Sequence, residues 1–158
     1  MRINNFIKIL SAGLILFVVF HFTLGRTSPG QVDNLITFKY DKTEIKIGDV
    51  IVNAEIARSR DQRMQGLSGR TSLEENTGML FIFEEDAMHG IWMKQMFIPI
   101  DIIWIDKDLL VVHTEENVSP DTYPEVFRPE IEARYVLEVP AGFVERVGVE
   151  SLGKVEMM

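Results

Sequence analysis

One apolar stretch of the chain contains an aromatic ring and two charged side chains, a combination that suits a small-ligand site. If the stretch is extended, Trp92 and Lys94 share one face of a strand, and Asp101 follows in the next apolar run. These residues predict a binding face with Trp92 as an aromatic platform and Lys94 and Asp101 as polar handles. A charge in an apolar stretch must be exposed or paired. A structural ion pair or a hydrogen-bond anchor beside a core tryptophan is therefore the competing interpretation.

Three arginines stand out in an acidic chain, at positions 63, 70 and 134. A guanidinium group can hold a carboxylate with two parallel hydrogen bonds, so the arginines predict a site for an anionic ligand. They would equally pair with Glu55, with Glu138 or with carbonyl groups at loop ends. The candidate binding surface predicted from the sequence therefore consists of Trp92, Lys94, Asp101, Arg63, Arg70 and Arg134.

The sequence contains no recognisable catalytic set. It has no cysteine, which excludes a thiol nucleophile, a disulfide and a cysteine-ligated metal. No Gly-x-Ser-x-Gly elbow occurs, and His89 and His113 lack the close spacing of paired metal ligands. We therefore predict no catalytic residue, no metal and no cofactor. An envelope hydrolase, assisted by a metal at His89 or His113, is the alternative that these histidines leave open.

Composition and charge narrow the class of partner. The chain has 158 residues with 46% hydrophobic content, which is enough for one domain with a packed core. Its formal net charge of −8 repels phosphate backbones and anionic lipid head groups. We therefore exclude nucleic acid as a partner, while acidity by itself selects no other.

Residues 1–25 predict a membrane segment. The apolar run from Phe6 to Leu24 would span about 28 Å as a helix, close to the hydrocarbon core of about 30 Å. Arg2 and Lys8 place the N-terminus in the cytoplasm by the positive-inside rule, so the rest of the chain is exported. We predict a single-pass anchor in the cell membrane. The alternative is a signal peptide cleaved near Gly25, which would give a secreted or periplasmic protein.

A short polar tether, residues 26–34, leads to one exported domain at residues 35–158. Ser59 is expected to begin a short helix, since Gln62 three residues later completes a capping box. A second short helix is expected at 143–147, between two glycines.

The rest of the domain has the pattern of short strands. Residues 84–86 read as an acidic turn, and residues 119–129, with three prolines, read as a long loop. Many short strands with two or three brief helices predict a mainly β fold, a compact β-sandwich or small barrel. The expected strands are 43–47, 50–57, 78–83, 91–97, 100–105, 109–114, 135–139 and 154–157.

Several ordered motifs resemble the prokaryotic domain of unknown function family 192 over about residues 45–157. The resemblance implies a compact β-sandwich or barrel with short helices, and it implies no activity, because the family has none assigned. The chain departs from the family pattern at Ser68, Gln95-Met96 and Gly153-Lys154. The matching motifs are Arg63-x-x-Gly66-Leu67 with Arg70, Gly78-Met79-Leu80-Phe81-x-Phe83, Trp92-Met93-Lys94 through Pro99 to Asp106, and Ala133 to Gly142.

These features favour a binding or accessory module outside the cytoplasm, attached to the membrane by its N-terminal helix. Its partner would be a small molecule, a glycan or an envelope protein, recognised by the face from Trp92 to Asp101 and by loop 119–129. The alternatives are the envelope hydrolase and a structural subunit of a membrane complex.

Overall fold

A computed structural model describes residues 38–151 and 153–158 of the chain. The predicted anchor or signal peptide (1–25) and the tether (26–34) lie outside the described residues. Within the described ranges, no helix is long and apolar enough to cross a membrane.

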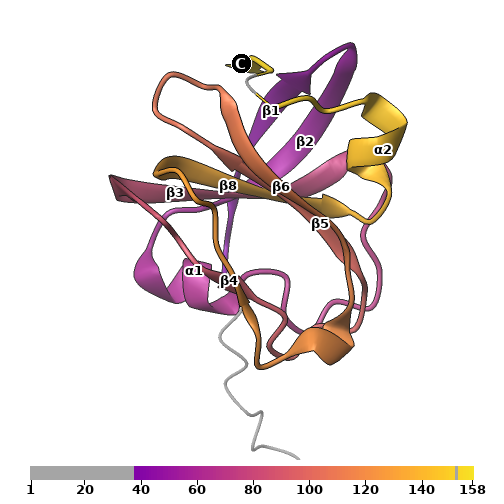
Figure 1. Ribbon diagram of the computed structural model, residues 1–158. Coiled ribbons are helices and arrows are strands. Elements are labelled where there is room, and N and C mark those ends of the chain that lie inside the picture. The colour runs from indigo at the N-terminus through magenta and orange to yellow at the C-terminus, as the bar shows by residue number, and fades with distance from the viewer. Residues whose placement is uncertain (1–37, 152) are drawn as a thin grey trace, which may run out of the picture. The chain divides into compact units, whose positions relative to one another are not determined.

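Most of the domain is one seven-stranded sheet with the order β6-β5-β8-β3-β2-β1-β9 (Figure 1). Neighbouring strands run antiparallel, except for β2 and β3, which are parallel. The strands of this sheet are β1 (Asp41–Ile47), β2 (Val50–Ala57), β3 (Thr77–Ala87), β5 (Ile100–Ile105), β6 (Val111–Val118), β8 (Ala133–Pro140) and β9 (Val155–Met157). A separate two-stranded sheet pairs β4 (Ile91–Trp92) with β7 (Val126–Phe127).

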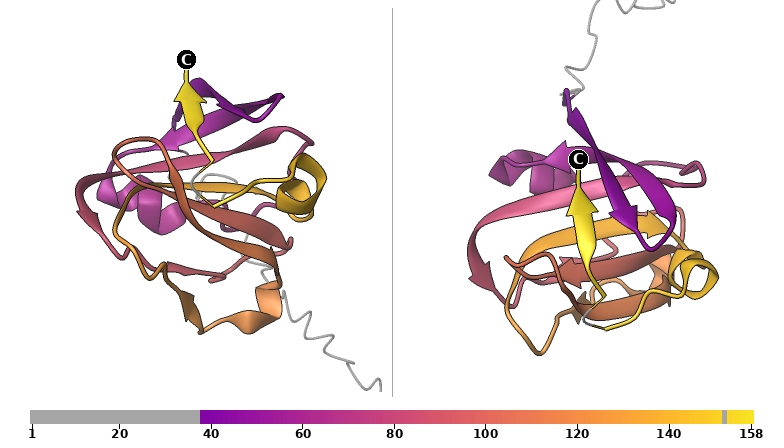
Figure 2. Two further views of the ribbon diagram at one scale, coloured as in Figure 1. Left: turned by 45° about the horizontal axis from the view of Figure 1, so that its top comes forward. Right: turned by 90° about the horizontal axis from the view of Figure 1, so that it is seen from above.

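The large sheet curls until its two edges meet at one end. The amide of Val111 donates to the carbonyl of Gly153 at 3.0 Å, and the amide of Val155 donates to the carbonyl of Leu109 at 2.8 Å. These bonds join the start of β6 to the start of β9, which are otherwise opposite edges of the sheet. The result is a curled half-barrel, which Figure 2 shows from two further directions.

Both faces are buried at the centre of the curled sheet, as β5 shows, since all six of its residues are buried. Strands covered on both faces have continuous apolar runs, which explains why this segment does not alternate. The inner-face core includes Ile45, Val52, Leu80, Ile103, Leu137 and Val155. The outer-face core includes Leu67, Met79, Phe81, Ile102, Trp104 and Val136.

Two short helices lie on opposite sides of the sheet (Figures 1 and 2). Helix α1 (Arg60–Gln65) begins at Ser59, whose hydroxyl accepts from the Gln62 amide while the Gln62 side chain accepts from the Ser59 amide. This is the predicted capping box. Helix α2 (Phe143–Val147) buries its first turn against the inner-face core.

The structure confirms a mainly β fold, and residues 38–151 and 153–158 contain two short α-helices and one 3₁₀ turn, η1 (Pro120–Thr122). The predicted hairpin of residues 43–47 and 50–57 is confirmed as β1 and β2. The helix predicted at 143–147 is confirmed as α2, with Gly148 as its C-cap.

Three local predictions are wrong. Residues 84–86 are not a turn, because β3 continues to Ala87. The pairing of β3 with β2 ends at Phe81, so the acidic residues occupy a part of β3 that β2 does not cover. The strand predicted at 91–97 ends at Trp92, and the 119–129 loop contains η1 and β7. Gln95 adopts a φ of 56°, which a strand does not tolerate.

Candidate functional site

A cavity of about 250 Å³ lies beside the outer face, bounded by α1, the turn after it and the small β4–β7 sheet. Its volume is below the roughly 300–1,000 Å³ typical of sites for drug-sized ligands, so it suits a small molecule. Its wall is mostly apolar. The apolar lining includes Leu67, Phe81, Phe83, Ile91, Trp92 and Val126.

Three arginines also line this cavity, at positions 60, 63 and 128. Arg63 is held in place, since Nη1 donates to the carbonyls of Arg58 and Ile82, and its guanidinium lies 5.0 Å from the centre of the Phe83 ring. None of the ion pairs formed within residues 38–151 and 153–158 involves any of the three arginines. Their positive charge is therefore available to a ligand.

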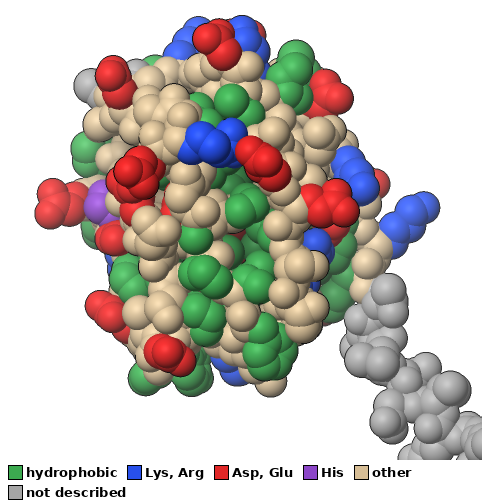
Figure 3. Space-filling view, turned by 90° about the vertical axis from the view of Figure 1, so that its right-hand side faces the viewer, with side chains coloured by type: hydrophobic (Ala, Val, Ile, Leu, Met, Phe, Trp, Pro, Cys, Tyr) green, Lys and Arg blue, Asp and Glu red, His purple; other side chains and the backbone are tan. Residues whose placement is uncertain are grey.

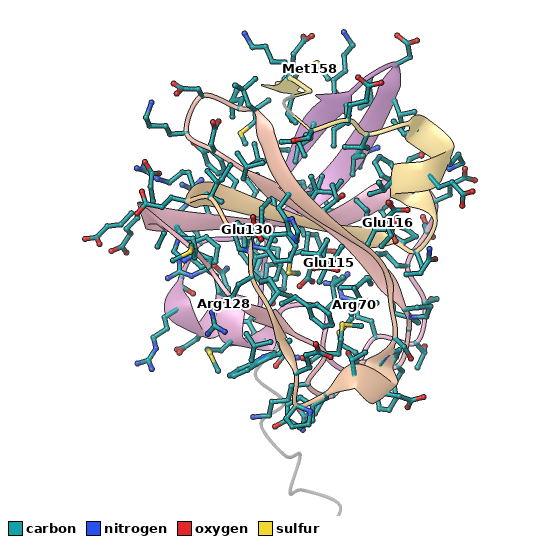
Figure 4. The ribbon with its side chains drawn as sticks, in the orientation of Figure 1. Arg70, Glu115, Glu116, Arg128, Glu130 and Met158 are labelled. Atoms are coloured by element: carbon teal, nitrogen blue, oxygen red, sulfur yellow. The ribbon has the colours of Figure 1, made fainter. Side chains whose placement is uncertain are left out.

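The small sheet positions Trp92 and Arg128 at the cavity. Trp92 pairs with Val126 across β4 and β7, and 42% of its surface is exposed. Gly90 allows close packing here, because a Cβ at this position would lie 3.1 Å from Cζ of Arg128. In the orientation of Figure 4, Arg128 lies below the large sheet, on the side of α1.

Glu138 is the acidic residue of the cavity lining, and it is only 5% exposed. Its backbone pairs with Met79 of β3 and Ile102 of β5, so its side chain is the part that reaches the cavity. Oε2 is buried and has no hydrogen-bond partner among the described residues. Burial raises the pKa of Glu138 to about 8, although the charge of Arg70 opposes the shift. The side chain is therefore mostly a neutral acid at neutral pH.

A second polar cluster surrounds Arg70, which follows α1. Its guanidinium donates to both carboxylate oxygens of Glu55, at 3.2 and 2.5 Å. The Tyr40 hydroxyl is buried without a described partner, and burial raises the pKa of this phenol. Arg70 also lies below the sheet in Figure 4. Arg70 is already paired with Glu55, and its charge offsets only part of the effect of burial on the pKa of Glu138.

Asp101 lies apart from the cavity and is fully buried. Oδ1 accepts from the amides of Asn117 at 2.7 Å and Gly142 at 3.2 Å, and Oδ2 accepts from the amide of Val144 at 2.8 Å. Helix α2 has glycine at its N-cap and no cap from its own sequence. Asp101 supplies that cap from β5, which matches the hydrogen-bond anchor that the sequence left open.

The other predicted site residues are dispersed. Lys94 is exposed and does not line the cavity, and its carbonyl accepts from the Ser68 hydroxyl. Arg134 pairs with Asp86 at 2.6 Å on the solvated end of β3. Of the six predicted residues, the structure brings only Trp92 and Arg63 to the cavity.

The two histidines do not meet in the cavity. His89 stacks on Phe83 with ring centres 3.5 Å apart, and its Nε2 lies 2.9 Å from the carbonyl of Glu85. His113 lies beside Glu115 at 3.0 Å. Among the described residues, no group of three histidine, aspartate or glutamate side chains could hold a metal ion. The arrangement thus offers no positive support for metal-assisted hydrolysis.

Glu138 was predicted from the sequence only as a partner for arginine, and Arg60 and Arg128 were not predicted as site residues. A signal for Glu138 was available, because it is a charge inside the apolar run 135–139. The same kind of signal predicted Asp101 as a site residue. No comparable signal existed for Arg60 and Arg128, since both are exposed arginines on separate elements.

A comparison with protein families matches residues 43–157 to domain of unknown function family 192, described as an uncharacterized ACR. The chain belongs to this family. The match spans nearly all of the described domain and confirms the resemblance found from the motifs. A search of curated proteins finds no match.

Two crystal structures resemble the domain. One is a protein from Sinorhizobium meliloti 1021 whose description proposes that it is a transcription regulator. It is 29% identical with a TM-score of 0.72, covering 77% of this chain and 97% of that one. The other is a protein of unknown function from Novosphingobium aromaticivorans DSM 12444. It is 26% identical with a TM-score of 0.69, covering 78% of this chain and 89% of that one.

Proposed function

We propose that this domain is a binding module for a small organic anion with an apolar body, held in the outer-face cavity. One observation carries the proposal: an apolar cavity beside an exposed tryptophan is bordered by three arginines that have no carboxylate partner among the described residues. The cavity's size favours a small molecule over the glycan and the envelope protein that the sequence left open.

The electrostatics of the domain support an anionic ligand. Acidic side chains are scattered over the face shown in Figure 3, in keeping with the net charge of −8. The three cavity arginines, which form no ion pair with another described residue, make the surroundings of the cavity locally positive. The apolar wall lowers the local dielectric constant, which strengthens their attraction for a carboxylate. Trp92 and Phe83 offer ring faces to an aromatic body.

The test uses a matched pair of probes, 4-isopropylbenzoate and its uncharged analogue 4-isopropylbenzamide. Titration calorimetry is carried out with the full chain purified in a mild detergent. We expect the benzoate to bind with a Kd on the order of 100 µM and the benzamide to bind about tenfold more weakly or not at all. Equal affinity for the two probes, or no binding of either, would overturn the proposal.

Substitutions locate the site. Arg128→Gln and Arg60→Gln should each weaken 4-isopropylbenzoate binding about three- to tenfold, since each removes one positive charge from the cavity. Arg146→Gln is the matched control, because Arg146 pairs with Glu75 and does not line the cavity. An equal loss in the control would mean that the arginines act through net charge alone.

We also propose that the module acts outside the cytoplasm, anchored by residues 1–25 or released by cleavage near Gly25. A C-terminal alkaline phosphatase fusion should be active in cells, because that enzyme folds only after export. An inactive fusion would contradict this location. Transcription regulation, proposed for the S. meliloti protein, is not transferred to this chain, because a net charge of −8 disfavours DNA.

A further inference from the structure

Glu138 is a buried acid whose two cross-strand neighbours on the outer face, Met79 and Ile102, are apolar. Oε2 has no hydrogen-bond partner among the described residues. An unsatisfied buried polar atom costs about 1–3 kcal/mol. Oε2 itself is enclosed, but Glu138 lines the cavity, so a ligand that reaches its carboxyl group would relieve this cost.

The charges around Glu138 come from several elements. Arg70, after α1, neutralises Glu55 of β2, while Arg63 of α1 and Arg128 beyond β7 line the cavity with it. A carboxylate at Glu138 would add a negative charge to an apolar wall. Because burial raises the pKa of Glu138 to about 8, the group retains its proton at neutral pH and can act as a hydrogen-bond donor.

We propose that the Glu138 carboxyl group donates a hydrogen bond to an uncharged oxygen at the inner end of the bound ligand. This inference rests on the proposed function and deepens it. The ligand would be a small carboxylate with an apolar or aromatic body and a carbonyl oxygen at the end opposite its charge. Glu138 would then determine specificity, whereas the arginines provide attraction for the anion.

An amine at the inner end of the ligand fits less well. It would require an ammonium ion and a carboxylate to be buried together in an apolar wall, and the desolvation of two ions often exceeds their attraction. A carbonyl oxygen can be buried without any ion, and it accepts a hydrogen bond from the protonated carboxyl group of Glu138. A protonated carboxylic acid in an apolar site is a known device for donating a hydrogen bond.

The experiment compares 4-acetylbenzoate with 4-isopropylbenzoate, which have nearly the same shape but differ by one carbonyl oxygen in place of a methyl group. By calorimetry on the full chain near pH 6.5, we expect 4-acetylbenzoate to bind about tenfold more tightly. Glu138→Met should abolish the preference because its side chain donates no hydrogen bond. Glu138→Gln should keep it, since the amide N–H can donate.

A second arm varies the pH. Near pH 9.5 the wild-type preference should disappear, because a carboxylate at Glu138 repels the carbonyl oxygen. Glu138→Gln should keep its preference at both values. This variant retains Glu55, Arg70, Tyr40, Arg63 and Arg128, so it controls for titration of these neighbours.

The outcomes separate the two proposals. If both probes bind the wild type equally, the role of Glu138 is overturned while the binding function stands. If neither binds, the proposed function itself fails. A preference that persists in Glu138→Met also overturns the inference. If Glu138→Met does not fold, the pH comparison between the wild type and Glu138→Gln decides. The inference requires that only the wild type loses its preference near pH 9.5. Loss in both proteins, or in neither, overturns the inference.

Discussion

Asp101 on β5 and Glu138 on β8 are two buried acids on adjoining strands, yet they lie on opposite faces of the sheet. Glu138 lies opposite Ile102, the residue next to Asp101. On the inner face, Asp101 accepts hydrogen bonds from three backbone amides. On the outer face, Oε2 of Glu138 has no described partner and the side chain borders a cavity.

The difference shows that burial of an acid does not by itself reveal its role. The inner face is closed by α2, and its acid holds that helix in place. The outer face is incompletely filled, and its acid is left with unused hydrogen-bonding capacity. An acid satisfied by the fold stabilises it, whereas an unsatisfied one lowers stability and is available for binding.

The largest loss of stability is expected from removing the inner-face acid. Asp101→Ala should lower the free energy of unfolding by about 3–5 kcal/mol, because three backbone amides, one of them that of buried Val144, lose their acceptor. Urea denaturation measures the change. Asp108→Ala is the control, since this exposed carboxylate pairs only with exposed Lys107 and should cost little. A change below about 1 kcal/mol in Asp101→Ala would show that these bonds contribute little.

Glu138→Gln should raise the free energy of unfolding at high pH, whereas Asp101→Ala should lower it. Folded Glu138 retains its proton between pH 4.5, the ordinary pKa of a glutamate, and its raised pKa of about 8, so the wild-type free energy of unfolding falls across this range and levels off above it. The substitution removes this decline. Near pH 9, Glu138→Gln should be more stable than the wild type by about 4 kcal/mol, and near pH 4 the two should be similar.

Denaturation curves measured from about pH 4 to 9 test this prediction. The control is Glu132→Gln, an exposed glutamate just before the same strand, which should leave the wild-type pH profile unchanged. If Glu138→Gln has the same pH profile as the wild type, Glu138 ionises in the folded protein as it does in the unfolded chain.

Removing the Arg70–Glu55 ion pair should perturb only the outer face and should have a smaller effect on stability. Arg70→Gln should lower the free energy of unfolding by about 1 kcal/mol, since a half-buried bidentate pair is lost. It should also raise the pKa of Glu138, because the charge of Arg70 lowers it in the wild type. Carboxyl carbon NMR titration of Glu138 reads this shift. Lys46→Gln, from the exposed Lys46–Glu156 pair, should leave that pKa unchanged.

The smallest effect on stability is expected at Trp92. Because this ring is 42% exposed, Trp92→Ala should change the free energy of unfolding by less than about 1 kcal/mol, yet weaken 4-isopropylbenzoate binding about tenfold. Phe97→Ala is the matched control, as Phe97 is a 66% exposed aromatic residue outside the cavity lining. Equal losses of binding in both variants would remove Trp92 from the site.

Local signals in the sequence predicted several elements well. Gly48-Asp49 predicted the turn between β1 and β2, and Ser59 with Gln62 predicted the start of α1. These succeed because a turn or a cap depends on residues a few positions apart. The acidic run 84–86 misled for the same reason. Its composition suits a turn, but its backbone pairing depends on strands far away in the chain.

The candidate site was less accessible from the sequence. Trp92 and Arg63 were selected by type, and both line the cavity. Asp101 and Glu138 gave the same signal, a charge in an apolar strand, but a strand's sequence does not reveal which of its two buried faces adjoins a cavity. That depends on α1, β4 and β7, which cover the outer face from three separate parts of the chain.

The sequence alone therefore determined the family, the β-rich composition, the turns and caps, and the acidity that disfavours nucleic acid. Those properties follow from short-range patterns and from totals over the chain. The tertiary structure decided which arginines remain without an acid, and that Asp101 is satisfied while Glu138 is not. Hydrogen bonding and burial depend on partners distant in sequence, as in the 43 positions that separate Asp101 from Val144.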